Sequence, residues 1–233
     1  MKLDKKEAIL GEVKKTLRKI YDKYEDMGLK SIYLWGSIIS EDFDYKKSDV
    51  DSIAIVDNKM PLNYEDKIIK EIKNASPKIK DFKIRFIYLD ELNNNTQKGN
   101  LTKYVSPRQL LWDLKYWDLV CGKRYSETDF KLDTNLNKII KEKRVDISKR
   151  FKEIISERVR DGQYFGKAVL RLIYYTEQQR DQFPYSYKNL LKCASPENKK
   201  MVHKLIQIKK DGWDLKQLKN EFMDIDKLIK KIA

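Results

Sequence analysis

The sequence predicts an α/β (α+β) N-terminal domain built on a small sheet, followed by an all-α helical-bundle domain. Short apolar runs with the length of strands occur in the first half of the chain, at 31–35, 49–56 and 82–89. From residue 136 onward, apolar side chains recur at helical spacing instead. These two periods are typical of strands and of amphipathic helices. The polar segment 126–134 lies between them, so we expect domains at 1–125 and 126–233.

Composition narrows the classes of protein to which the chain can belong. Of its 233 residues, 41% are hydrophobic, which is enough for two small cores. No run of eighteen apolar residues is present, and the charged N-terminal segment lacks the apolar core of a signal peptide. We therefore expect a cytoplasmic protein without a membrane partner. The net charge of +14 favours polyanionic partners, either a nucleoside triphosphate or nucleic acid.

The first predicted strand ends in a pattern that suits phosphate binding. Residues 5–27 have the apolar spacing of a helix, and a strand follows at 32–35. Gly36 and Ser37 break that strand. Glycine lets a ligand approach the backbone closely, and the exposed N–H groups and the serine hydroxyl can hold phosphate oxygens.

The second predicted strand begins with two carboxylates. After an eleven-residue loop at 38–48, Asp49-Val50-Asp51 opens the apolar run that ends at Val56. Side chains at i and i+2 of a strand point to the same face, so Asp49 and Asp51 are expected to project together. Two adjacent carboxylates repel each other, and a divalent cation relieves that repulsion. Hard oxygen ligands of this kind suit Mg²⁺, which also binds substrate phosphates.

The remaining predicted elements are mostly helices. In the first half we expect a helix at 64–74, a strand at 82–89, a loop at 93–104, and a helix that starts at Ser106-Pro107 and runs to Leu119, with Gly122 closing it. In the second half we expect helices at 136–160, 163–180 and 187–193, one that starts at Ser195-Pro196, and one at 213–232.

The ordered combination of strand, Gly36-Ser37, loop, Asp49-Val50-Asp51 and strand resembles the signature of the polymerase-beta-like nucleotidyltransferase superfamily. The resemblance implies a small mixed sheet and a magnesium-dependent transfer of a nucleoside monophosphate, AMP from ATP, onto an acceptor hydroxyl. It implies that Asp49 and Asp51 bind Mg²⁺ and are catalytic. It also implies that Gly36, Ser37 and Ser48 bind the nucleotide.

One feature departs from that superfamily, in which a neighbouring strand supplies a third acidic residue as metal ligand or base. Here the corresponding position falls near Lys83 or Arg85, both of which are basic. Three interpretations stay open. The third carboxylate comes from Asp81 or Asp90 at the ends of that strand, it comes from Glu41 or Asp44 in the loop, or the site binds nucleotide without turnover.

Residues 170–205 resemble the helical domain of aminoglycoside adenylyltransferases of the streptomycin and spectinomycin type. The matching motifs are Tyr174-Tyr175, Ser186-Tyr187-Lys188 and Ser195-Pro196. The resemblance implies that Lys188 binds the triphosphate and that the acceptor is a small molecule. The alternative interpretation is that the tyrosines are bundle core and that Lys188 is a surface residue. Two other functions stay open: a catalytically impaired nucleotide-binding or regulatory protein, and a nucleotidyltransferase acting on RNA or on a partner protein.

Overall fold

The computed structural model describes residues 2–44, 48–79, 81–156, 162–177 and 185–231, and it divides the chain into two compact units, Met1–Thr134 and Asn135–Ala233. The segment 126–134, which the sequence placed in the second domain, packs on the first unit. Phe130 and Leu132 contact the core of that unit, and the Lys131 backbone N–H donates a hydrogen bond to the Asn93 side chain. These contacts move the end of the first unit from residue 125 to residue 134.

The first unit is built on a mixed sheet, as expected. Its elements, in chain order, are α1 (Lys2–Tyr24), β1 (Leu29–Trp35), the 3-10 turn Gly36–Ile39, β2 (Val50–Val56), α2 (Tyr64–Ala75), β3 (Phe82–Tyr88), α3 (Leu89–Asn94), α4 (Pro107–Asp113), the 3-10 turn Leu114–Tyr116, β4 (Asp118–Gly122) and the 3-10 turn Glu127–Asp129. Within the described ranges the strand order is β3-β2-β1-β4. β1 is antiparallel to both β2 and β4, whereas β2 and β3 are parallel.

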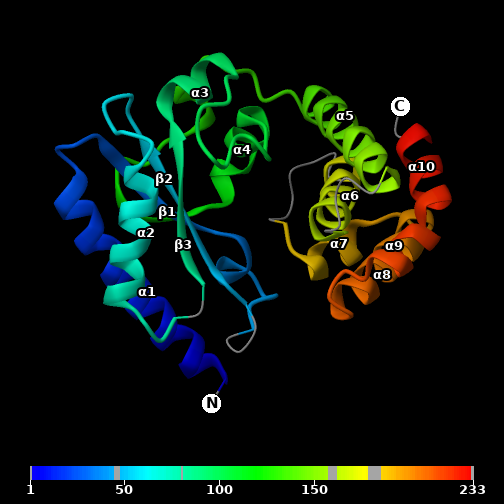
Figure 1. Cartoon of the computed structure of the whole chain (residues 1–233), viewed down its shortest axis with the longest axis horizontal. Helices are drawn as coiled ribbons and strands as arrows, with labels where there is room; N and C mark the ends of the chain where they lie inside the picture. Colours follow the sequence, from blue (N-terminus) through cyan, green and yellow to red (C-terminus); the bar gives the residue numbers. More distant parts are fainter. Residues whose placement is uncertain (1, 45–47, 80, 157–161, 178–184, 232–233) are drawn as a thin grey trace. The chain divides into compact units, whose positions relative to one another are not determined.

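Helices cover both faces of this sheet. Figure 1 shows α1 and α2 on one side of the strands and α3 and α4 toward the other. The first face buries Leu34, Ala54 and Phe86 against α1 and α2, and the second buries Tyr33 and Ile53 against α4. Alternate residues of each strand therefore reach different cores, which explains why these strands are apolar on both sides.

The region after Ser106-Pro107 corrects one expectation. The Ser106 side chain caps α4 as predicted, accepting a hydrogen bond from the Gln109 N–H, but the helix ends at Asp113. Residues 118–122, expected as the end of that helix, form β4 on the free edge of β1. The spacing of Leu110, Leu114 and Trp117 suits a helix, and the sequence alone does not reveal the open strand edge that recruits the next residues. A second correction is α3, which takes Leu89 from the end of the expected strand and Asn93 and Asn94 from the start of the expected loop.

The described part of the second unit consists of helices. They are α5 (Leu136–Ile155), α6 (Gly162–Glu177), α7 (Tyr187–Cys193), α8 (Pro196–Lys210), α9 (Leu215–Asn220) and α10 (Phe222–Lys231). The predicted starts at Ser186 and Ser195 are confirmed, because both side chains accept a capping hydrogen bond. The single helix expected at 213–232 is instead two helices that meet at Glu221. The expected helix ends at 157–160, 178–180 and 232 lie outside the described residues.

Two buried glutamates protect the outer edge of β3. An edge strand exposes backbone N–H groups that have no partner within the sheet. The Phe86 N–H donates to Glu65 and the Tyr88 N–H donates to Glu91, each over 2.8 Å. Glu91 also accepts hydrogen bonds from the Gly99 N–H (2.8 Å), the Thr102 hydroxyl (2.5 Å) and the Lys98 N–H. A fully buried carboxylate thus joins the edge of β3 to the segment that follows α3.

No helix within the described ranges is both long and apolar enough to cross a lipid bilayer.

Because Glu91 satisfies several N–H groups at once, Glu91→Ala is expected to lower the free energy of unfolding by about 3 kcal/mol or more. The exposed Glu7 on α1 provides a control, since Glu7→Ala is expected to change it by less than about 0.5 kcal/mol. Urea unfolding of both variants measures the difference. Equal losses in the two variants would show that Glu91 is not a structural anchor.

Candidate active site

A left-handed glycine ends β1 beside one of the two aspartates. Gly36 has φ +79°, a conformation that L-residues with a side chain rarely adopt. A Cβ built at Gly36 would lie 3.5 Å from Oδ2 of Asp51. The chain then turns through the 3-10 segment that contains Ser37. Glycine at this position therefore makes the turn possible and keeps the space beside the Asp51 carboxylate open.

The strand register places a row of three residues across one face of the sheet. Asp51 on β2 is the partner of Trp35 on β1 and of Lys83 on β3. Cross-strand partners project to the same face, so these three side chains share it. This is also the face on which Ile53 and Ile55 pack against α4, further along β2. Asp49 directly precedes β2. The carboxylates thus lie at the start of β2, where the apolar face ends.

Lys83 reaches the aspartate pair. Its Nζ lies 3.9 Å from Oδ2 of Asp49, and the two side chains are 33% and 47% exposed. An ion pair this exposed contributes about 0–1 kcal/mol to stability. The backbone of Lys83 is held more firmly, because the Ser52 hydroxyl donates a 2.8 Å hydrogen bond to its carbonyl oxygen. The structure therefore fixes the position of Lys83 and leaves its ammonium group partly accessible to a ligand.

Arg85, the other basic residue of β3, is engaged elsewhere. Its Nη1 lies 2.9 Å from Oε1 of Glu65, a side chain that is 2% exposed. The Asn100 amide donates to the same oxygen over 3.1 Å. Arg85 therefore neutralises the buried carboxylate at the edge of β3. Of the two basic residues that the sequence identified, Lys83 is the one beside the aspartates.

No third carboxylate joins Asp49 and Asp51. Within the described ranges, no group of three or more His, Cys, Asp and Glu side chains is arranged to hold a metal ion. Asp90 follows the far end of β3, at roughly 20 Å for a strand of this length. Asp81 precedes Phe82, the partner of Val50, so it lies at the correct end of the sheet. Neither Asp81 nor the loop residues Glu41 and Asp44 complete a three-carboxylate cluster with the pair.

The loop between β1 and β2 is closed by its own polar groups. The Ser48 hydroxyl accepts a 3.0 Å hydrogen bond from the Asp44 N–H. The Ser40 hydroxyl donates to the Ser37 carbonyl oxygen over 3.1 Å, and Lys6 of α1 donates to the Ser40 carbonyl oxygen over 2.9 Å. Ser37 and Ser48 thus each take part in a hydrogen bond with another described residue of this segment. Their assignment as nucleotide ligands stays a prediction.

The residues present suit one divalent cation. Asp49 and Asp51 are both partly accessible, and each offers carboxylate oxygens on the same side of β2. Mg²⁺ is commonly held by one or two carboxylates together with substrate phosphates and water. The turn at Gly36 and Ser37 lies beside Asp51, where a phosphate could complete such a shell. A metal and a triphosphate therefore fit this place by donor chemistry.

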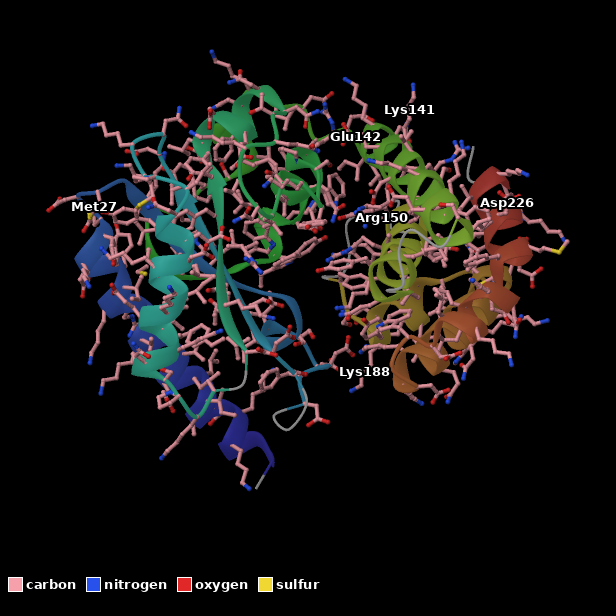
Figure 2. All side chains as sticks on the ribbon, in the orientation of Figure 1. Met27, Lys141, Glu142, Arg150, Lys188 and Asp226 are labelled. Atoms are coloured by element: carbon pink, nitrogen blue, oxygen red, sulfur yellow. The ribbon has the colours of Figure 1, made fainter. Side chains whose placement is uncertain are left out.

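The residues singled out in the second unit have two different environments. Tyr174 and Tyr175 on α6 are fully buried, as the bundle-core interpretation expects. Lys188 lies on α7 and is exposed (Figure 2). It belongs to the other compact unit, so its assignment to the triphosphate stays a prediction.

Trp35 is a neighbour of the aspartates that the sequence analysis did not select. It is partly buried, and its ring lies 6.4 Å from that of Trp117. Its position in the sequence could have identified it. Trp35 directly precedes Gly36, and antiparallel pairing of the two strands places it across from Asp51. An aromatic side chain beside the Gly36 turn provides a flat surface next to the candidate site.

Gly36→Ala is expected to lower the free energy of unfolding by about 1–2 kcal/mol, because it forces a side chain into the left-handed region. Gly212 is a matched control, with φ +78° and open space around its missing Cβ. Gly212→Ala should therefore cost a similar amount. Urea unfolding tests this; a Gly36→Ala variant as stable as the unsubstituted protein would contradict the left-handed turn.

Comparison with known proteins bears on the fold. No protein-family model and no curated protein matches the chain. Among solved structures, spectinomycin adenyltransferase AAD(9) from Enterococcus faecialis, determined with ATP and spectinomycin, is similar, with a TM-score of 0.51 and 16% sequence identity. The similarity covers 84% of this chain and 88% of that one. The chain therefore shares its overall fold with that adenyltransferase structure.

Proposed function

We propose that this protein is a magnesium-dependent nucleotidyltransferase that moves AMP from ATP onto a hydroxyl of a small-molecule acceptor. The observation that carries the proposal is the arrangement at the start of β2. Asp51 lies between the Gly36 turn and the strand that carries Lys83, and Asp49 precedes it. The similarity in fold to an adenyltransferase determined with ATP and spectinomycin supports the same class of donor and acceptor.

Each residue of the arrangement has a role in the proposed reaction. Asp49 and Asp51 hold the cation, and the turn at Gly36 and Ser37 binds phosphate oxygens through backbone N–H groups and the Ser37 hydroxyl. Bound Mg²⁺ supplies charge stabilisation at the triphosphate. The acceptor oxygen forms a bond to the α-phosphorus, the bond from that phosphorus to the bridging oxygen breaks, and pyrophosphate leaves. The proton of the hydroxyl passes to a base. Asp81 is the proposed base, because it precedes β3 at the end of the sheet where Asp49 precedes β2.

The net charge of the chain agrees with the proposed function. The net charge of +14 favours binding of a triphosphate. The cytoplasmic location and the assignment of Lys188, Ser37 and Ser48 to nucleotide binding remain part of the proposal. The acceptor is described only by its reacting hydroxyl, because acceptor choice depends on the surfaces around the site and not on the fold.

One observation favours a second candidate function, a nucleotide-binding or regulatory protein without turnover. The position beside Asp51 that would supply a third carboxylate carries Lys83, which pairs with Asp49. ATP binding without transfer to any hydroxyl acceptor, RNA and protein included, would favour this candidate.

Asp49→Asn and Asp51→Asn are each expected to reduce transfer of labelled AMP from α-³²P-ATP by about 100-fold or more, because the amides hold Mg²⁺ weakly. The assay measures labelled acceptor in the presence of Mg²⁺ over a panel of aminoglycosides, other polyols and RNA. Far-ultraviolet circular dichroism checks that the variants stay folded.

The exposed Asp26 supplies the control, since it lies before β1 at the end of the strand remote from Gly36. Asp26→Asn makes the same chemical change and should leave transfer within about two-fold of the unsubstituted protein. Undiminished transfer in the Asp49 and Asp51 variants would refute the assignment of the metal ligands.

A further inference from the structure

Lys83 places a positively charged side chain beside the two aspartates. Lys83 is the register partner of Asp51, and its ammonium group lies 3.9 Å from the Asp49 carboxylate. The β2–β3 ladder and the hydrogen bond from Ser52 hold its backbone in place. The Lys83 side chain contacts the outer side of the pair, on β3, whereas the Gly36 turn lies on the β1 side. The carboxylates are thus bordered by a phosphate-binding turn on one strand and by a positive charge on the other.

This arrangement bears on how many metal ions the site can hold. In two-metal sites the ions lie about 3.5–4 Å apart and share carboxylate ligands. The Lys83 ammonium group lies 3.9 Å from the Asp49 carboxylate, so a second divalent ion bound to that carboxylate from the β3 side would meet it at close range. Like charges at this separation repel strongly. Within the described ranges no third carboxylate is grouped with Asp49 and Asp51 so as to hold a second ion against that repulsion.

We propose that Lys83 takes the place of one of two divalent cations, so that the site binds the nucleotide with a single metal ion. This inference rests on the proposed function. Asp49 and Asp51 would hold the single cation, and the Lys83 ammonium group would contact the triphosphate in place of the other cation. Lysine is suited to this role, because it is a compact charge on a flexible stem and binds phosphate as a point charge.

The electrostatic balance of the site agrees with this exchange. Three carboxylates with two divalent cations carry one net positive charge. Two carboxylates with one lysine and one divalent cation carry the same net charge. A lysine in place of the third carboxylate thus removes a ligand of the second metal ion. It also supplies the positive charge that makes the second ion unnecessary for charge balance. Lys83 is in this account a catalytic residue, since it touches the substrate.

Metal counting tests the proposal without relying on activity. The protein is saturated with an ATP analogue that has a methylene group between the α and β phosphorus atoms, and Mn²⁺ is titrated while electron paramagnetic resonance records free and bound ion. The unsubstituted protein is expected to bind one Mn²⁺ per bound analogue, with no spin coupling. Lys83→Glu restores a carboxylate next to Asp51 and is expected to bind two Mn²⁺ with a coupled spectrum. Lys59→Glu, an equal charge reversal beyond the opposite end of β2, should keep one.

The outcomes distinguish a failure of the single-metal inference from a failure of the proposed function. Two coupled Mn²⁺ ions in the unsubstituted protein would overturn the single-metal inference and leave the proposed function standing. A folded Lys83→Glu variant that still binds one ion would overturn it as well, because Lys83 would not be the group that excludes the second. Absence of analogue binding by the unsubstituted protein would refute the proposed function and the inference together.

Discussion

The placement of β2 between β1 and β3 is the constraint on which the rest of the site depends. Antiparallel pairing with β1 brings Asp51 level with Trp35, one residue before the left-handed Gly36. Parallel pairing with β3 brings Lys83 to the other side of Asp51. A shift of β2 by one residue along β1 would turn the Asp51 carboxylate toward the α1–α2 core, and a shift of β3 by one residue along β2 would turn Lys83 to the opposite face. Strand register, and not the local Asp-x-Asp pattern, therefore determines what surrounds the carboxylates.

Buried charges at the edge of the sheet support that register. The carboxylates of Glu65 and Glu91 accept hydrogen bonds from backbone N–H groups on the outer edge of β3, and Arg85 forms an ion pair with Glu65. These contacts prevent further strand pairing at that edge and hold β3 against α2 and the segment after α3. They also explain why two basic residues on one strand have different surroundings. Arg85 stabilises the edge, and Lys83 remains available at the candidate site.

The sequence selected Gly36, Asp49 and Asp51 as candidates and marked the basic residues of the neighbouring strand, but it did not distinguish Lys83, which lies beside the aspartates, from Arg85, which does not. Two short apolar runs, the Gly36-Ser37 break between them and the period-two alternation at 82–89 were sufficient to place β1, β2 and β3, because those signals are local. β4 was missed because its position depends on an open edge that only the folded sheet provides. Glu65 and Glu91 were missed because acidic residues in short helices are usually exposed, and only tertiary contacts reveal their burial.

The central claim is that Asp49 and Asp51 together bind a divalent ion that carries the triphosphate. A crystal structure with Mn²⁺ and a non-hydrolysable ATP analogue tests it most directly, through anomalous scattering from the metal. The account predicts one anomalous peak within bonding distance of both carboxylates, with phosphate oxygens at the Gly36 turn. Nucleotide bound elsewhere, with both aspartates free of metal, would contradict it.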